Sequence, residues 1–220
     1  GVPYEKHPRF HEVMAEDSGQ SVLSSLESHI LPLVPGLTER LGDGARVLDL
    51  GCGRGLILNR LARLFPRSRF TGIDLSADAI TYANAQAKEL PNLDYIARDL
   101  SDFDRTAQCE AYDFITTFDA IHDQSRPLNV LRGIQRALRA DGVYLMQDIS
   151  GTGHVEKDAE HPLGTLLYTV SCMHCMTVSL AQGGEGLGAM WGEPKTVEYL
   201  RKAGFTQVET RRLAHDVMNN

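Results

Sequence analysis

Short apolar runs and amphipathic stretches alternate along most of the chain. The apolar runs are rich in β-forming residues, and the stretches between them place apolar side chains at helical spacing. The predicted strands are 46–50, 69–75, 93–97, 112–118, 143–149 and 205–213, and the predicted helices are 56–65, 77–87, 127–139 and 196–203. Because strands that alternate with helices usually pair in parallel, this order predicts a mostly parallel, doubly wound α/β sheet.

The first forty residues have a different pattern. Residues 1–20 are polar and contain a group of aromatic and histidine side chains, which suits an arm or a lid, and 21–33 is an amphipathic helix. We therefore divide the chain into an N-terminal arm and helix, 1–40, and one α/β domain, 41–220. The chain begins without methionine and stops where such a sheet still needs a strand, so we expect a piece of a longer protein that possibly lacks its last strand.

A glycine-rich turn follows the first predicted strand. Gly51, Gly53 and Gly55 stand at alternate positions and lead directly into a helix. Glycines let a ligand approach the backbone, and a helix N-terminus offers free N–H groups to it, so the turn predicts a site for a nucleoside-bearing cofactor. A dinucleotide site would need a third glycine where Leu56 stands. Asp49 would also repel a pyrophosphate, whereas it can accept hydrogen bonds from an ammonium group.

The run Val-Leu-Asp-Leu-Gly-Cys-Gly-Arg-Gly, residues 47–55, resembles the first motif of class I S-adenosylmethionine-dependent methyltransferases. The resemblance implies a Rossmann-like fold and S-adenosyl-L-methionine as cofactor. It implies that the methionine end lies on Asp49, Gly51, Cys52 and Gly53, the ribose on Asp74, the adenine on Leu75, Asp99 and Leu100, and the sulfonium near Phe118. Read without the resemblance, Asp74 and Asp99 are each equally well explained as caps at strand ends.

Longer runs resemble one bacterial subfamily of the mycobacterial type. They are Phe-Asp-Ala-Ile-His-Asp-Gln at 118–124, Leu-Met-Gln-Asp-Ile at 145–149, and Ser-Cys-Met-His-Cys-Met-Thr-Val-Ser-Leu-Ala-Gln-Gly-Gly at 171–184. Complete chains of that subfamily carry an N-terminal winged-helix-like domain, which is absent from this sequence. In such relatives the added domain makes dimers, so a homodimer is a possible assembly. The resemblance does not supply the methyl acceptor.

Polar residues are dense after the fourth predicted strand, where this family places its reacting groups. His122 is the candidate general base, because an imidazole titrates near neutral pH, and Asp119 or Asp123 would orient it. The alternative is that His122 only packs beside the cofactor and fixes the loop. The predicted substrate pocket is formed by Asp119, Asp123, Asp148, His174 and Trp191.

Residues 151–192 form an insertion between the fifth strand and the next helix. Its segment 163–181 is just long enough to span a membrane, but it contains polar residues and lies inside an α/β pattern, so we expect a buried or interface helix. The glycines after it suit a mobile loop that lets Trp191 close over a ligand. Cys172 and Cys175 have the spacing of metal ligands, but no second pair exists. We therefore expect a packing seam or pocket lining and no metal.

Composition narrows the function further. The net charge is −7 with no basic run, which argues against a nucleic-acid acceptor. Four cysteines are too few for a disulfide scaffold, and the first residues are polar, so we expect reduced thiols and a cytoplasmic protein. The sequence predicts methyl transfer from S-adenosylmethionine to a small molecule, without nucleic-acid or membrane partners. The alternatives are a non-catalytic module that binds S-adenosylmethionine or S-adenosylhomocysteine and, less well supported, a nicotinamide dehydrogenase.

Overall fold

The computed structural model describes residues 1–7, 9–214 and 216–219. Its regular helices and strands are α1 Phe10–Ser18, α2 Leu37–Asp43, β1 Arg46–Leu50, α3 Leu56–Leu64, β2 Arg69–Asp74, α4 Ala77–Gln86, β3 Leu93–Ala97, α5 Phe103–Thr106, β4 Tyr112–Phe118, α6 Pro127–Ala137, β5 Leu138–Gln147, α7 Val155–Asp158, α8 Gly164–Val170, α9 Met176–Ala181 and α10 Glu193–Ala203. Tighter or wider helical turns occupy Tyr4–Lys6, Gly19–Leu23, Leu26–Ile30, Leu31–Leu33 and Ser171–Cys175.

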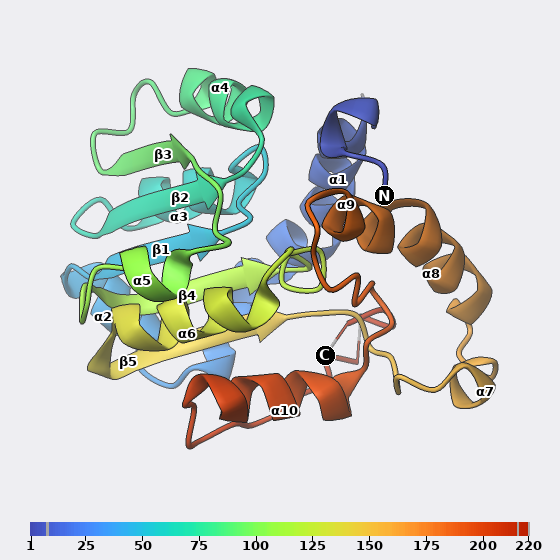
Figure 1. Cartoon of the computed structure of the whole chain (residues 1–220). Coiled ribbons are helices and arrows are strands. Elements are labelled where there is room, and N and C mark those ends of the chain that lie inside the picture. The colour runs from blue at the N-terminus through green and yellow to red at the C-terminus, as the bar shows by residue number, and fades with distance from the viewer. Residues whose placement is uncertain (8, 215, 220) are drawn as a thin grey trace.

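The predicted parallel sheet is confirmed. The five strands lie in the order β3-β2-β1-β4-β5, and every neighbouring pair is parallel (Figure 1). After β3 the chain returns to the other side of β1, so the direction of winding reverses between β1 and β4. In open α/β sheets such a reversal leaves a crevice at the carboxyl ends of the strands, where ligands bind.

The core has two layers, one on each face of the sheet. Successive strand residues point to opposite faces, so Val47 and Leu48, both fully buried, belong to different layers. The Val47 layer contains α3, α4 and the N-terminal helical segment, including Val22 and Leu26. The Leu48 layer contains α5, α6 and α10. Residues 21–33 are helical as predicted, and they are part of the core of the domain.

The N-terminal segment and the insertion meet beside the carboxyl ends of the strands (Figure 1). The insertion forms one continuous helical rod, Gly164–Ala181, from α8 to α9, and the Val2 amide donates to the Thr177 carbonyl at 3.0 Å. Among the described residues, this rod is long and apolar enough to cross a membrane, and 39% of it is buried in the protein. Length and composition alone are weak evidence for a span, since core helices meet the same criteria.

The predicted strand at 205–213 is wrong. None of these residues is in a strand, and a cavity of about 590 Å³ lies between them and β5. An alternating side-chain pattern does not make a strand unless a neighbour completes the hydrogen-bond ladder. The described tail meets the chain just beyond β5 through an antiparallel bridge between Ile149 and Asn219, and the centroid of the Phe205 ring lies 5.6 Å from that of Tyr144 in β5. The predicted fifth strand is displaced: it begins at Leu138, where the backbone leaves the helix, and ends at Gln147.

Candidate functional site

A cavity of about 120 Å³ lies at the carboxyl ends of β1, β2 and β4 and is covered by α1. All the residues predicted to hold the cofactor line it: Asp49, Gly51, Cys52, Gly53, Asp74, Leu75, Asp99, Leu100 and Phe118. The sheet brings them together because its parallel strands end at the same edge. Their individual roles toward a cofactor stay predictions.

The glycine turn is tied to the end of β2 by Asp74. The Gly53 amide donates to Oδ2 of Asp74 at 2.8 Å, and the Ser76 amide donates to Oδ1 at 2.8 Å. Gly51 has a φ of +74°, and a Cβ atom there would lie 2.4 Å from the Cβ of Ala120. The first glycine is therefore needed both for its backbone conformation and for a close approach to the loop after β4.

Asp49 is a buried carboxyl group at the floor of the cavity. It is 3% exposed, and Thr116 Oγ1 donates to its Oδ1 at 2.8 Å. Burial raises its pKa to about 7, against the lowering effect of the Thr116 hydrogen bond. A carboxyl group in this position gains most from a cationic partner, such as the ammonium group of a methionine moiety.

Asp99 caps a turn and also lines the cavity, and its role toward the adenine stays a prediction. It caps its own turn, because the Ser101 amide donates to Oδ1 at 2.8 Å and the Ser101 hydroxyl to Oδ2 at 3.0 Å. It also lines the cavity next to Leu100, which is buried. The capping bonds fix the carboxylate without removing it from the cavity wall.

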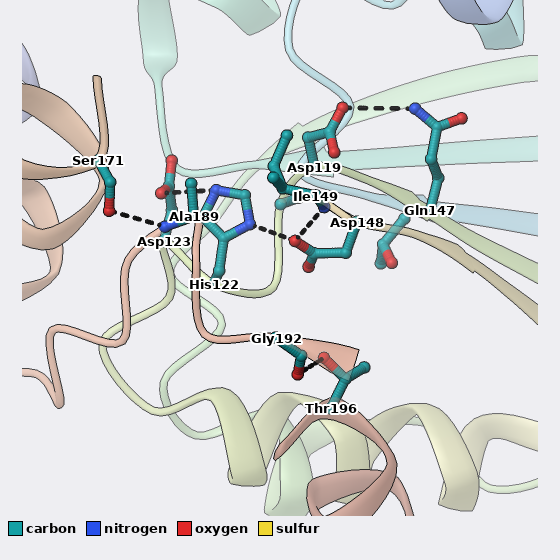
Figure 2. Close-up of polar contacts among 12 residues, drawn as sticks. Asp119, His122, Asp123, Gln147, Asp148, Ile149, Ser171, Ala189, Gly192 and Thr196 are labelled. Carbon is teal, nitrogen blue, oxygen red and sulfur yellow. Dashed lines mark hydrogen bonds and ion pairs between the residues drawn. The ribbon is translucent and has the colours of Figure 1, made fainter. Parts of the chain in front are cut away.

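Asp119 and Asp123 line the cavity from the loop after β4. Asp119 has a φ of 50°, a left-handed conformation that is uncommon outside glycine and is tolerated best by Asp and Asn. Burial, followed by the charge of Asp148, raises its pKa to about 8. Its nearest polar partner is the Gln147 amide, whose Nε2 donates to Oδ2 at 3.4 Å (Figure 2).

His122 lies between two carboxylates behind this wall (Figure 2). Its Nδ1 is 2.6 Å from Asp148 Oδ1, and its Nε2 is 3.2 Å from Asp123 Oδ1. Burial alone disfavours the imidazolium, but the charges of Asp148 and then Asp123 outweigh it and raise the pKa of His122 well above its ordinary value. His122 is 3% exposed and does not itself line the cavity.

The other predicted substrate-pocket residues lie further away. Asp148, His174 and Trp191 do not line this cavity. Trp191 is buried in the Leu48 layer, where its ring packs against Tyr199 with centroids 5.6 Å apart. His174 stacks on Phe10 with a centroid distance of 3.5 Å, and burial, followed by the charges of nearby histidines, lowers its pKa to about 3.

The arm or lid expected from the sequence supplies part of the wall, but sequence reasoning named none of its residues as lining the site. Tyr4, Phe10, His11 and Met14 line the cavity, and the Tyr4 hydroxyl donates to Asp123 Oδ2 at 3.4 Å. The signal was the group of aromatic and histidine side chains in an otherwise polar arm. Only the fold shows which strand ends that arm covers.

A family model described as a methyltransferase domain matches residues 41–203, which is most of the chain. The chain belongs to this methyltransferase family. The ubiquinone biosynthesis O-methyltransferase of Actinobacillus pleuropneumoniae is 31% identical over 113 residues, 50% of this chain and 47% of that protein. The malonyl-[acyl-carrier protein] O-methyltransferase of Bacillus cereus is 32% identical over 111 residues, 50% of this chain and 40% of that protein.

The matched part of the chain thus covers less than half the length of these curated relatives. Among solved structures, the complex of the trans-methyltransferase CalH with S-adenosylhomocysteine (SAH) matches with a TM-score of 0.59 at 20% identity. The match covers 84% of this chain and 55% of that one. At that identity the likeness concerns the fold.

Proposed function

We propose that this methyltransferase domain transfers a methyl group from S-adenosyl-L-methionine to a small-molecule acceptor. The observation that carries the proposal is the cavity at the switch point of the sheet, where the glycine turn is bound to Asp74 and the buried Asp49 faces inward. The family match and the SAH complex of the CalH methyltransferase support the choice of cofactor.

The residues present fit this cofactor. A glycine turn without side chains admits the methionine moiety, and the buried carboxyl group of Asp49 offers a partner to its ammonium group. Asp74 keeps free lone pairs for the ribose hydroxyls while it accepts the two backbone amides. When bound, the sulfonium supplies an activated methyl group. The chain contributes alignment of donor and acceptor and a cavity closed to water.

We place the acceptor at the end of the cavity formed by Asp119, Asp123 and Tyr4. Both curated relatives are named O-methyltransferases, which supports an oxygen atom as methyl acceptor. The role of His122 in this proposal is positioning, because both of its ring nitrogens face carboxylates and it reaches the cavity only through Asp123. The proposal thus takes up the alternative in which His122 fixes the loop, and a direct catalytic role for it stays a prediction. A cytoplasmic location, a homodimer, and the absence of nucleic-acid and membrane partners stay predictions.

Calorimetry with SAH tests the cofactor site. Replacing Asp74 with Ala removes hydrogen bonds from a carboxylate, each worth about 1.5–3 kcal/mol, so we expect SAH affinity to fall roughly 10- to 100-fold. Asp74→Asn should lose affinity less severely. Asp94→Ala is the matched control, because Asp94 is exposed on the adjacent β3 and does not line the cavity. Equal affinities of the Asp74→Ala variant and the wild type contradict the proposal.

The rival functions give different results in related assays. Binding of SAH without methylation of any compound in a metabolite extract, followed with labelled cofactor, favours a regulatory module. Thermal stabilisation by NADH but not by SAH favours a dehydrogenase.

A further inference from the structure

Behind the cavity wall, His174 and Cys175 of the insertion face the loop after β4. The donor atoms of His122, Asp123 and Cys175 all lie within 4.8 Å of one another, and the three side chains are buried. Cys175 interacts with both His122 and Asp123. His174 lies beside this group but outside the set of mutually close donors, with its Nε2 3.7 Å from Asp123 Oδ2. Two segments about fifty residues apart thus bring two imidazoles, a carboxylate and a thiol together.

The distances from the two imidazoles to the Asp123 carboxylate are close to those between ligand atoms around a small ion. Zinc ligands lie about 2.0–2.3 Å from the metal, so the ligand atoms of a tetrahedral site are roughly 3.3–3.8 Å apart. The distance from His122 Nε2 to Asp123 Oδ1 is 3.2 Å, and that from His174 Nε2 to Asp123 Oδ2 is 3.7 Å. The imidazole, carboxylate and thiol groups are the ligand types that zinc selects.

Several of these atoms have no hydrogen-bond partner. His174 is only 6% exposed, and both of its ring nitrogens are buried without a hydrogen-bond partner. Asp123 Oδ1 is also without one, because His122 Nε2 lies close to it but is not aligned for a hydrogen bond. Buried polar atoms in native proteins are nearly always paired, so unpaired nitrogens that face a carboxylate indicate a missing partner.

The surroundings of His122 are those of a metal-bound histidine. Its Nδ1 contacts Asp148 Oδ1 at 2.6 Å (Figure 2), which leaves Nε2 directed toward Asp123. Metal-bound histidines almost always use their second nitrogen to bind a carboxylate or carbonyl group in this way, which fixes the ring orientation. Asp148 would therefore be the outer partner of the site.

We propose that His122, Asp123, His174 and Cys175 bind one divalent transition-metal ion of the zinc class. The Asp123 carboxylate and the Cys175 thiolate balance the two charges of the ion, and the histidines bind as neutral imidazoles. The ion ties the helical insertion to the loop after β4 and holds Asp123 at the cavity wall. The site differs from the Cys172–Cys175 pair that the sequence suggests, because Cys172 is exposed and Cys175 is buried.

Cobalt substitution tests this site directly, without an assay of methyl transfer. Protein stripped with a chelator is titrated with Co²⁺, and we expect one ion per chain with a thiolate-to-cobalt absorption band that Zn²⁺ abolishes. Cys175→Ser should lose the band. Cys172→Ser should keep it, because that thiol lies three residues away on the same helix and is exposed. Zn²⁺ should raise the melting temperature of the wild type and of Cys172→Ser, but not of Cys175→Ser.

A second variant covers a failure of Cys175→Ser to fold. His174→Gln keeps the thiol, so its cobalt spectrum should persist with an affinity at least tenfold weaker. Circular dichroism and SAH calorimetry establish that each variant is folded. Failure of the wild type to take up either ion overturns the proposal. So do equal spectra of the two cysteine variants, or an unchanged cobalt affinity of His174→Gln.

Discussion

Asp119 has an unusual backbone conformation, and its carboxyl group is buried where the charged form is unfavourable. Its φ is 50°, it is adjacent to the His122 cluster, and burial with the charge of Asp148 raises its pKa to about 8. The ordinary pKa of an aspartate is about 3.9, so the folded protein holds this proton over a pH range in which the unfolded chain releases it. The contribution of Asp119 to stability is therefore present at low pH and is lost as the pH rises to about 8.

Asp119→Asn should consequently stabilise the protein by an amount that grows as the pH rises from about 4 to about 8. Asn tolerates the same backbone conformation and carries no charge. We expect the gain in melting temperature to be larger at pH 8.5 than at pH 5.5 by roughly 3–6 °C, measured by calorimetry. Asp94→Asn, at an exposed position, is the control and should show no such trend. A gain that is independent of pH would mean that the raised pKa is not the cause.

Gly51 and Gly53 both belong to the glycine turn after β1, but the space around their Cα atoms differs. Both have positive φ, of +74° and +51°, but only at Gly51 would a Cβ collide, with the Cβ of Ala120. Gly53→Ala should cost about 1–2 kcal/mol from backbone strain, or roughly 2–8 °C in melting temperature. Gly51→Ala should cost clearly more.

The double variant Gly51→Ala with Ala120→Gly separates the two effects. Removing the Ala120 methyl group relieves the collision but not the strain, so the double variant should melt near Gly53→Ala. If Ala120→Gly restores nothing, the close approach of the turn to the loop after β4 is not what requires glycine.

At the level of single residues, the sequence predicted the cofactor wall better than the acceptor end. Asp49 and Asp74 lie at the carboxyl ends of β1 and β2, and Asp99 comes shortly after β3, so the parallel sheet alone brings them to one edge. His174 and Trp191 lie in the insertion, where no periodic pattern fixes which side chain faces inward. The contact of His122 with Asp148 depends on how two loops pack, which spacing along the chain does not encode.

Among the elements, α1 has the most direct bearing on ligand exchange. A cavity of about 120 Å³ is smaller than the roughly 300–1,000 Å³ of typical small-molecule sites. Phe10 of α1 lines it and stacks on His174 of the insertion. We infer that α1 moves away to admit the cofactor and returns to cover it.

Phe10→Ala should therefore release the cofactor faster. Loss of the stacking on His174 weakens the closed position of α1, and we expect SAH dissociation to accelerate about tenfold with little change in association, measured by stopped-flow fluorescence or surface plasmon resonance. Val13→Ala is the control on the same helix, because Val13 is exposed and does not line the cavity. Identical dissociation rates for the Phe10→Ala variant and the wild type would argue against a lid.

Element prediction succeeded where strands carry apolar runs and failed at the C-terminal end. Strands β1 to β4 lie where the apolar runs predict them; β1, β2 and β4 are buried between neighbouring strands and helices, and β3 at the edge keeps Leu93 and Tyr95 buried. Residues 205–213 alternate apolar and polar side chains but have no ladder partner, because a cavity lies between their backbone and β5 and only side chains such as Phe205 reach that strand. A strand needs a neighbour, and the sequence of the segment does not reveal whether the neighbour is reached.

For the whole molecule, the alternation of strands and helices was sufficient to predict the sheet, and the glycine turn was sufficient to predict which edge carries the cavity. The N-terminal segment was separated from the domain in the prediction at residue 40, yet Val22, Leu26 and Ile30 are buried in the same layer as Val47. Amphipathic pattern alone does not say whether a helix belongs to a core or to an arm.

The cysteine thiols lie at opposite ends of the parallel strands and differ in their accessibility to reagents. Cys109 is exposed in the connection that leads to the amino end of β4, whereas Cys52 and Cys175 lie at the opposite end of the strands, where burial raises the pKa of both thiols. In a Cys172→Ser background, a maleimide dye at neutral pH would attach to Cys109 in preference to the buried thiols. The molecule thus carries a natural anchoring point for fluorescence or surface immobilisation on the end remote from the ligand, so that α1 can be watched while it opens.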